Sequence, residues 1–191
     1  MKRIGITGGI GSGKTYVSEV FKSLGIPVFN ADVESKKLMT TSESLMSLVK
    51  TEFGEDIYTN GSLNKEKLAS IVFSDKSKLE KLNSFVHPIV KAEFEKWCTK
   101  QSSAYVIKEA AILFESKANI GLDAVICVSA PLQLRIDRAT KRDNTNEQEI
   151  KNRIENQISQ EEKENLSDYI IVNDNKEMLL PQIINIHKLL S

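Results

Sequence analysis

The sequence predicts an α/β fold in which helices cover both faces of a five-stranded parallel sheet. Two observations favour this class. Short runs rich in Val and Ile alternate with longer segments of helical periodicity, and a glycine-rich turn connects the first such run to the first helix. Buried parallel strands are continuous apolar runs, and each needs a crossover connection that is usually a helix. The alternation therefore indicates three layers, a sheet between two layers of helices.

The expected elements follow one another along the chain. The apolar runs that we expect to form the strands are residues 2–7, 26–29, 105–107, 124–128 and 169–172. Helical periodicity predicts a helix over 14–24, which ends before Gly25, and a last helix from about 176 to 190.

Residues 32–103, between the second and third expected strands, show helical spacing of apolar side chains and almost no strand pattern. The apolar positions at this spacing are Leu45, Leu48, Val49, Leu68, Ile71, Val72, Leu79, Leu82, Val86, Val90 and Phe94. The segment is either an insertion that only packs on the sheet or a substrate-binding part. We favour the second, because ligands lie beyond the carboxyl ends of parallel strands. His87-Pro88 marks a kink or a new helix start, and His87 and His187 as lone histidines are expected to be structural.

Composition limits the class of protein. At 191 residues the chain suits a single compact unit. Lys plus Arg and Asp plus Glu both number 26, and this zero net charge argues against a general nucleic-acid or membrane-surface binder. No apolar run approaches the roughly 20 residues of a membrane span, and because an apparent strand begins at Lys2 we expect no signal peptide.

Cys98 and Cys127 lie far apart without a CxxC motif, so we expect buried reduced thiols and a cytoplasmic protein. We also expect a monomer or weak oligomer.

The most specific motif is the turn Gly8-Gly9-Ile10-Gly11-Ser12-Gly13-Lys14-Thr15, which satisfies GxxxxGK(S/T) between a strand and a helix. Its glycines allow the backbone to turn several N–H groups toward one phosphate, and the following helix adds its positive end. Lys14 should then bridge the β- and γ-phosphates of a nucleotide, and the Thr15 hydroxyl should bind Mg²⁺. The expected nucleotide-binding residues are Gly11, Ser12, Gly13, Lys14, Thr15 and Tyr16. The alternative is a turn that only resembles the motif, but the flanking strand and helix favour a P-loop NTPase fold.

Three carboxylates follow the expected strands. Asp32 follows the second strand and could deprotonate an acceptor hydroxyl or help to hold Mg²⁺ through water; a role as N-cap of the next helix is equally favoured. Glu109 ends the third strand, where an acid in P-loop proteins helps to position Mg²⁺. Glu115 comes six residues later, and this spacing alone favours a solvated surface glutamate.

Arg135, Arg138 and Arg142 follow the fourth strand at helical spacings of three and four. The core stripe expected in this helix consists of Leu132, Ile136 and Ala139. The arginines are therefore expected together on one flank, as part of a lid over a phosphoryl group or as a solvated face. Residues 141–165 are polar, with a helix expected near 147–158, and suggest a mobile or exposed element. We favour the lid, because in this nucleotide-binding chain the arginine helix is followed directly by that polar stretch.

Several short motifs stand in an order that is typical of one enzyme family. They are Ile6-Thr7-Gly8-Gly9-Ile10-Gly11-Ser12-Gly13-Lys14, Asn30-Ala31-Asp32, His87-Pro88, Ile112-Leu113-Phe114-Glu115, the Arg135 and Arg138 helix, Arg153 with Gln157, and Asp168-Tyr169-Ile170-Ile171-Val172-Asn173. In this order they resemble the bacterial dephospho-coenzyme A kinases over nearly the whole chain. The phosphate loop combined with the HP and LFE motifs is far more specific than the loop alone.

The resemblance implies a kinase that transfers the γ-phosphoryl group of ATP, with Mg²⁺, to the ribose 3′-hydroxyl of dephospho-CoA. It implies that Asp32 is the base near the acceptor hydroxyl and that Arg138 is a catalytic residue close to the transferring phosphate. Beyond the loop, the residues implied for nucleotide binding are Arg142 and Asn173. Those implied for substrate binding are Asp32, His87 and Glu115.

The resemblance also implies three parts within one P-loop kinase domain over residues 1–191. These are a nucleotide-binding core (about 1–31, 104–135 and 167–191), a helical CoA-binding insertion (about 32–103) and a lid (about 136–166). Three positions depart from the usual pattern of the family: Asn30 replaces a second acid, Ala111 replaces a proline, and Thr15-Tyr16 replaces Ser-Thr. None of these changes removes a group that phosphoryl transfer requires.

Two other functions share part of these features. A nucleoside or nucleotide monophosphate kinase has the same fold and lid, but the HP and LFE motifs disfavour it. A nucleotide-dependent switch usually carries DxxG and NKxD motifs, and the sequence contains neither.

Overall fold

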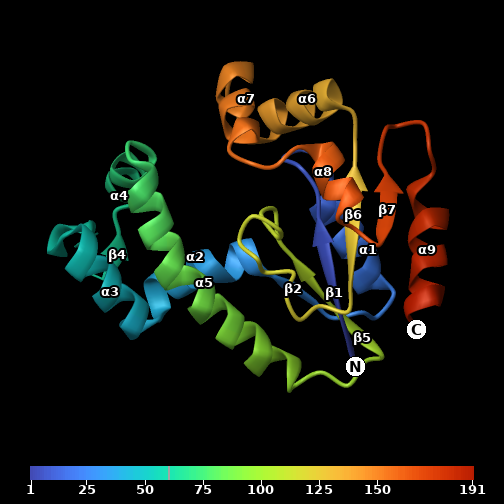
Figure 1. Ribbon diagram of the computed structural model, residues 1–191, viewed down its shortest axis with the longest axis horizontal. Coiled ribbons are helices and arrows are strands. Elements are labelled where there is room, and N and C mark those ends of the chain that lie inside the picture. The colour runs from blue at the N-terminus through green and yellow to red at the C-terminus, as the bar shows by residue number, and fades with distance from the viewer. Residues whose placement is uncertain (60) are drawn as a thin grey trace. The chain divides into compact units, whose positions relative to one another are not determined.

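The structure, a computed structural model, describes residues 1–59 and 61–191 and divides the chain into two units. The core unit comprises residues 1–30 and 100–191, and the insertion unit comprises residues 31–99. Each unit has its own helices and strands (Figure 1). Within the described residues, no helix is both long enough and apolar enough to cross a membrane.

The core unit is built on a parallel sheet. Its strands are β1 (Lys2–Thr7), β2 (Val28–Asn30), β5 (Tyr105–Glu109), β6 (Ala124–Ser129) and β7 (Tyr169–Val172). In the part of the chain that the structure describes, these five strands lie in the order β2-β5-β1-β6-β7, and each neighbouring pair is parallel. β1 is central, with Ile6 opposite Glu109 of β5 and Ile126 of β6. The predicted parallel α/β fold is confirmed, and the turn after β1 begins at the middle of the carboxyl edge of the sheet.

Two elements begin later than predicted. β2 begins at Val28, two residues late, because Pro27 has no N–H to donate to a strand ladder. The Pro27 carbonyl still accepts a hydrogen bond from the Ile107 N–H, at 2.9 Å. The last helix begins at Leu179 rather than near 176, because the Asp174 carboxylate accepts hydrogen bonds from two following backbone N–H groups and holds a turn there.

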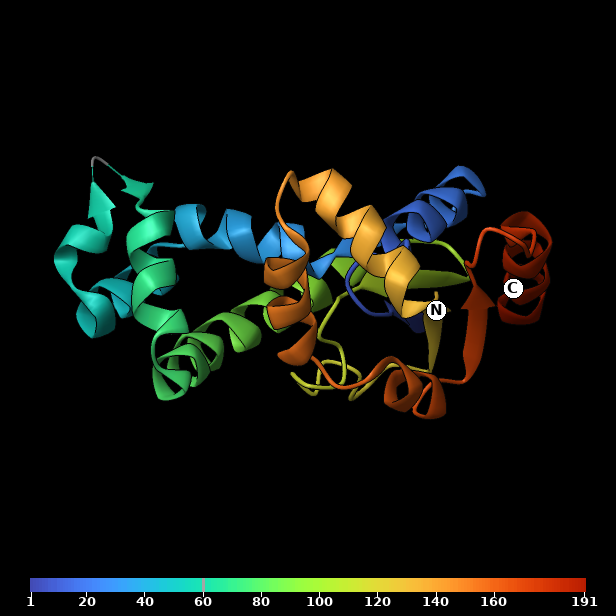
Figure 2. The ribbon, with the colours of Figure 1, turned by 90° about the horizontal axis from the view of Figure 1, so that it is seen from above.

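Helices α1 (Lys14–Ser23) and α9 (Leu179–Leu190) cover one face of the sheet, with α9 beside β7 (Figure 2). The buried cluster that joins them to the strands consists of Ile4, Ile6, Val17, Phe21, Ile26, Tyr105, Ile107, Ile126, Val128, Ile171, Ile183, Ile186 and Leu190. On the other face, the segment after β5 packs on the central strand. A Cβ at Gly5 would lie 2.7 Å from a methyl carbon of Leu113, so the leucine side chain packs closely on β1 at this glycine. The predicted three-layer order is present, with the turns of residues 111–121 forming part of the layer on this face.

Helices α6 (Leu132–Asp143) and α7 (Glu147–Glu155) pack against each other, and α8 (Gln160–Asn165) follows. The small core of the α6–α7 pair consists of Ile136, Ala139 and Ile150, with Ile10 and Ile154 packed against it. The expected core position of Leu132 is wrong. Leu132 is the first residue of α6 and is 56% exposed, because α7 packs against the helix a full turn further along. The helix expected near 147–158 is present as α7, which ends at Glu155, and a separate helix begins after the N-cap Ser159.

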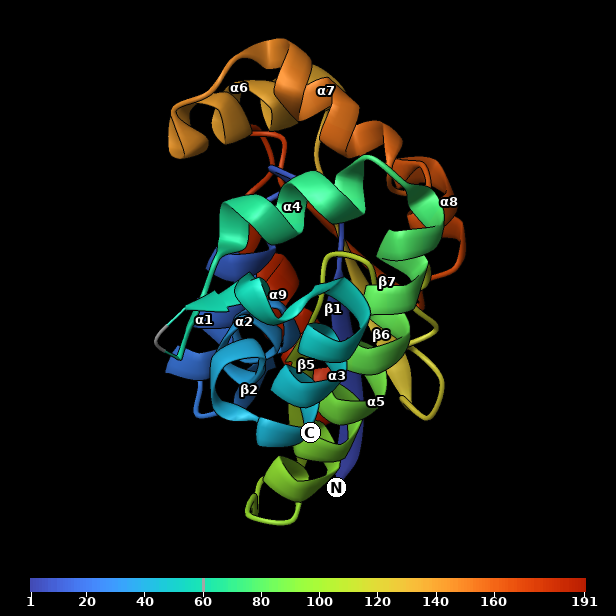
Figure 3. The same ribbon diagram turned by 90° about the vertical axis from the view of Figure 1, so that its left-hand side faces the viewer.

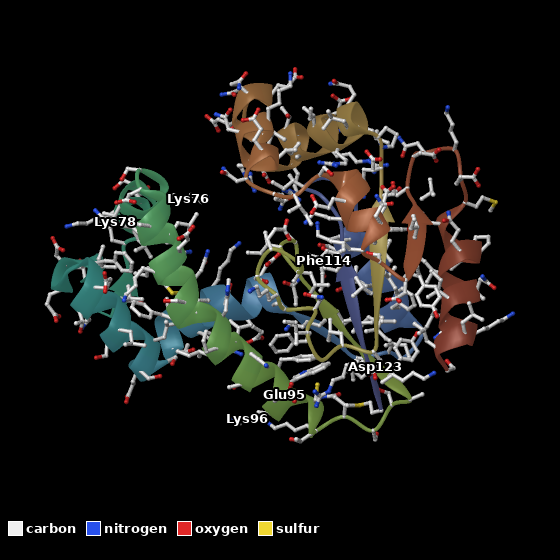
Figure 4. The ribbon with its side chains drawn as sticks, in the orientation of Figure 1. Lys76, Lys78, Glu95, Lys96, Phe114 and Asp123 are labelled. Atoms are coloured by element: carbon white, nitrogen blue, oxygen red, sulfur yellow. The ribbon has the colours of Figure 1, made fainter. Side chains whose placement is uncertain are left out.

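The insertion unit is mainly helical. Its elements are α2 (Ala31–Thr41), α3 (Glu43–Phe53), a 3-10 helix (Glu55–Ile57), β3 (Tyr58–Thr59), β4 (Ser62–Leu63), α4 (Lys65–Phe73) and α5 (Lys76–Cys98). α2, α3 and α4 each contact α5 (Figure 3). Side-chain caps set three of the helix starts: Ser42, Asn64 and Asp75 each accept a hydrogen bond from a backbone N–H in the first turn. Figure 4 shows Lys76 and Lys78 at the start of α5 and Glu95 and Lys96 near its end.

The insertion unit differs from the prediction in three respects. β3 and β4 form an antiparallel pair that the sequence did not indicate, because each strand has only two residues. Leu48, expected on a buried face, is 42% exposed, whereas Leu45 and Val49 are buried. Pro88 lies inside α5, so His87-Pro88 does not start a new helix.

Candidate active site

The phosphate loop joins β1 to α1, and its glycines are needed where they stand. Gly11 and Gly13 have φ angles of 77° and 97°, in the region that favours glycine. A Cβ at Gly11 would lie 2.1 Å from the carbonyl oxygen of Arg135, and a Cβ at Gly13 would lie 2.3 Å from Nδ2 of Asn173. The loop is therefore packed from outside by α6 and by the segment after β7. A turn in which left-handed residues alternate with others can direct successive backbone N–H groups inward, which suits an anion.

Lys14 is the first residue of α1, and its side chain folds over the loop. Its ammonium group donates hydrogen bonds to the carbonyl oxygens of Gly8 at 2.8 Å and Gly9 at 3.2 Å, and the residue is 9% exposed. Within the described residues, α1 has no side-chain cap and no acid in its own first turn, so no side chain of that turn compensates the positive end of its dipole. The cation and the helix end thus face the same loop, and both attract phosphate.

Thr15 and Glu109 come together beside the loop from α1 and β5. The Thr15 hydroxyl donates to Oε1 of Glu109 at 2.8 Å, and Nδ2 of Asn30 donates to Oε2 of Glu109 at 3.0 Å. A hydroxyl and a carboxylate are hard oxygen donors of the kind that Mg²⁺ prefers, and Mg²⁺ usually takes only one or two carboxylates and completes its shell with phosphates and water. The donor set therefore fits the predicted metal site, and Asn30 orients its carboxylate.

Arg135 braces the phosphate loop from α6. It is buried, and its Nε donates to the Ile10 carbonyl oxygen at 3.2 Å. A Cβ at Gly9 would lie 2.5 Å from Cζ of Arg135, so the guanidinium lies directly against the loop. The three arginines that were expected on one flank each have their own partners in the structure. Arg135 is thus part of the support of the loop rather than of a solvated face.

Two glutamines after α7 also hold the loop. Oε1 of Gln160 accepts a hydrogen bond from the Gly9 N–H at 2.9 Å, and its Nε2 donates to Glu164 at 2.9 Å. Oε1 of Gln157 accepts from the Ile10 N–H at 3.4 Å. The sequence did not single out Gln160, because a lone glutamine in a polar stretch carries no pattern. The chain that returns from α6 and α7 is therefore tied to the phosphate loop.

Arg138 and Asn173 lie at the other side of the loop. The Arg138 guanidinium donates to the Asn173 carbonyl oxygen at 3.1 Å, to its Oδ1 at 3.3 Å and to Oδ1 of Asn175 at 2.5 Å. Nδ2 of Asn173 donates to the Ser12 carbonyl oxygen at 2.7 Å. A cavity of about 390 Å³ opens here, lined by Gly13, Tyr16, Arg138, Asn173 and Leu179.

Arg142, implied at the nucleotide, is the outermost of the three arginines. It donates two hydrogen bonds to the carboxylate of Asp143, and Arg153 of α7 donates a third at 2.6 Å. These hydrogen bonds, that of Arg142 first, hold the pKa of the Asp143 carboxyl well below its usual range. A lowered pKa means that the stabilisation is complete at neutral pH and is lost only as the pH falls below about 4. In this structure Arg142 therefore pairs with a carboxylate of its own helix, and Arg153 links α7 to that carboxylate at the end of α6.

Glu115 is not the solvated surface residue that its spacing suggested. Its Oε1 accepts hydrogen bonds from Lys163 at 2.5 Å and from the Ile158 N–H at 3.2 Å. Lys163, on α8, is 0% exposed and also donates to the Ala111 carbonyl oxygen at 3.0 Å. The expectation is wrong because a lysine 48 positions later in the chain folds onto the carboxylate. The pair fixes the segment after β5 to the start of α8, near Gln157 and Gln160.

Replacing Lys163 by methionine is expected to lower the free energy of unfolding by about 3 kcal/mol, because Glu115, which is largely but not fully buried, is left without its cation. Urea denaturation followed by circular dichroism measures the change. The double variant Glu115→Leu with Lys163→Met should recover much of the loss, since an apolar pair needs no counter-ion. A Lys163→Met protein as stable as the wild type would show that the pair contributes nothing.

Asp32 and His87 belong to the insertion unit. The helix α2 begins at Ala31, so Asp32 lies within its first turn and is not the N-cap, and that alternative is wrong. A carboxylate in this position still complements the helix dipole. His87 is half-buried within α5.

The cysteines and the terminal histidine have structural surroundings. Cys98 and Cys127 are both buried, and burial raises the pKa of the Cys127 thiol to about 11, which keeps it protonated near neutral pH. Nδ1 of His187 lies 2.7 Å from the Tyr105 hydroxyl between α9 and β5. The expected buried thiols and the structural role of His187 are consistent with this placement.

A glycine loop that turns toward an anion, with a lysine over it and a hydroxyl–carboxylate pair beside it, suits a magnesium nucleotide and the transfer of its terminal phosphoryl group. Together with the parallel sheet, this site defines the class of the protein, a P-loop kinase. A family model described as dephospho-CoA kinase matches residues 2–178. The chain belongs to the dephospho-CoA kinase family.

Individual relatives agree with the family model. The dephospho-CoA kinase of Bacteroides fragilis (strain YCH46) is 39% identical over 185 residues, which cover 96% of this chain and 90% of that protein. The solved structure of dephospho-CoA kinase from Campylobacter jejuni is 26% identical with a TM-score of 0.73, covering 100% of this chain and 98% of that chain. TT1252 from Thermus thermophilus is 29% identical with a TM-score of 0.84, covering 98% and 95%. The predicted family and the predicted kinase class are confirmed.

Proposed function

We propose that this chain transfers the γ-phosphoryl group of Mg·ATP to the ribose 3′-hydroxyl of dephospho-CoA, giving CoA and ADP. Membership of the dephospho-CoA kinase family over residues 2–178 supports the acceptor. The observation that supports the chemistry is the phosphate loop, in which Lys14 and the Thr15–Glu109 pair flank the same turn.

On the donor side, residues Gly11 to Tyr16 hold the triphosphate through backbone N–H groups. Lys14 exchanges its loop carbonyl partners for oxygens of the β- and γ-phosphates, since an ammonium group gains more from two anions than from two neutral carbonyls. Thr15 and Glu109 hold the metal ion, with Asn30 orienting Glu109. Bound there, Mg²⁺ would neutralise charge on the phosphate oxygens.

On the acceptor side, we assign Asp32 as the base for the ribose hydroxyl and His87 as a contact of the substrate. Glu115 acts by positioning, because its Oε1 is already shared by Lys163 and a backbone N–H. Because Arg138 donates hydrogen bonds to Asn173 and Asn175, we favour a position of its guanidinium beside the nucleobase. The contact of Arg138 with the transferring phosphate, and that of Arg142 with the nucleotide, remain predictions.

The proposal includes the layout of the chain and its surroundings. We assign residues 32–103 to acceptor binding and 136–166 to a lid, which closes over the loop where Ile10 packs between α6 and α7. The zero net charge favours small-molecule partners, ATP and dephospho-CoA, over nucleic acid or a membrane surface. Buried thiols suit a cytoplasmic monomer or weak oligomer.

The test is release of ADP from Mg·ATP with and without dephospho-CoA, alongside AMP, dTMP, adenosine and shikimate as rival acceptors. We expect strong stimulation by dephospho-CoA alone, with CoA formed in equal amount to ADP. Omission of Mg²⁺ should abolish the stimulation, because the donor charge is then left unneutralised. Stimulation by another acceptor would overturn the proposed substrate, and no stimulation by any acceptor would overturn the kinase activity.

A further inference from the structure

A cavity lined by Gly13, Tyr16, Arg138, Asn173 and Leu179 adjoins the phosphate loop at Gly13. Gly13 directly precedes Lys14, so a ligand with its terminal phosphates in the loop extends its other end past Gly13. At about 390 Å³ the cavity is within the usual size of small-molecule sites, about 300–1,000 Å³. This step depends on the proposed function, because that function supplies the nucleotide.

One wall of this cavity is the Arg138 guanidinium, and its orientation is fixed. Three oxygens accept its hydrogen bonds: the carbonyl and Oδ1 of Asn173, and Oδ1 of Asn175. Asn173 is itself held by its hydrogen bond to the Ser12 carbonyl oxygen. A planar cation that already uses its N–H groups in this way offers its flat face to a ligand rather than further donors.

The lining of the same cavity also includes an exposed aromatic residue. Tyr16 is 63% exposed, whereas the neighbouring α1 residues Lys14 and Val17 face the interior. Most of the surface of this residue is therefore left uncovered by the protein itself. A flat ligand in the cavity would cover it and gain that burial.

We propose that Tyr16 is a specificity-determining residue, whose ring stacks on the purine base of the phosphoryl donor and holds it against the Arg138 guanidinium. A base has a π face on each side, so an aromatic ring and a guanidinium can contact it together. Stacking grows with the area of overlap, so this clamp favours a purine over a pyrimidine. It adds nothing to the binding of the phosphates, which depends on the loop.

The test compares two probes, Mg·ATP and Mg·tripolyphosphate, by calorimetric titration of the wild type and of Tyr16→Ala. We expect the Kd for ATP to rise by about 5- to 100-fold, the effect of losing one base–aromatic stack, with the Kd for tripolyphosphate unchanged. The preference for ATP over CTP should shrink in the same variant. Tyr16→Phe should retain the ATP affinity because the ring is kept, and Leu189→Ala, an exposed apolar change on α9, serves as matched control.

Two outcomes would overturn the inference: an unchanged Kd for ATP in Tyr16→Ala, or an equal loss for tripolyphosphate, which would mean that the loop itself was damaged. The binding assay contains no acceptor. A wild type that binds ATP with the expected Tyr16 dependence but does not phosphorylate dephospho-CoA would refute the proposed substrate and leave the role of Tyr16 supported.

Discussion

Replacing Lys14 by alanine is expected to lower kcat for dephospho-CoA phosphorylation by about 10²–10³-fold, as the loss of one fixed group that stabilises transition-state charge does elsewhere. The ammonium group of Lys14 donates hydrogen bonds to the loop carbonyls of Gly8 and Gly9, and alanine removes it. Alanine is a good helix former at the start of α1 and leaves the loop glycines untouched. Turnover should therefore collapse while the fold persists.

The measurement is ADP release at saturating Mg·ATP and dephospho-CoA, with thermal unfolding followed by circular dichroism. Lys22→Ala is the matched control, because Lys22 is an exposed lysine on the same helix, paired only with Glu19 in the ion pairs of the described residues. We expect normal turnover from the control. A folded Lys14→Ala protein with near-normal turnover would contradict the phosphate-loop mechanism.

The sequence predicted the donor site because its chemistry is local. Gly8 to Thr15 are contiguous, and a strand and a helix on either side of such a turn leave few alternatives. Glu109 was placed correctly for a similar reason, since it ends a strand that pairs with β1 in the expected parallel order. The sheet was predicted from continuous apolar runs, and only the ends of some strands differ from the prediction, as at Pro27.

Contacts between distant segments could not be predicted in this way. Glu115 was taken for a surface residue because its partner Lys163 comes from another helix, and no spacing rule joins the two. Gln160 was missed for the same reason, although it holds the N–H of Gly9. Helical spacing placed Arg135, Arg138 and Arg142 on one flank, but the partners of each depend on what folds against α6.

Replacing Asp32 by asparagine is expected to lower kcat by about 10²–10⁴-fold, the usual contribution of a general base, with the Kd for ATP mostly kept. Asp32 follows β2 by two residues and lies in the first turn of α2 without being its cap, so capping no longer explains an acid at this position. Asparagine has the same shape and still accepts hydrogen bonds, but it cannot accept the proton of a hydroxyl. Stopped-flow or steady-state ADP release, together with calorimetric titration of ATP, separates the two effects.

Asp32 could instead only stabilise α2 through the helix dipole, and the chain offers a control for that alternative. Glu34 is the other acid in the first turn of α2 and pairs with Lys37. Glu34→Gln removes one negative charge from the same helix end, a change of about 0.3–1 kcal/mol in stability for either residue. If the base assignment is right, the two variants unfold alike and only Asp32→Asn loses turnover. Equal and near-normal turnover in both would reduce Asp32 to a helix-stabilising acid and leave the acceptor hydroxyl without its proposed base.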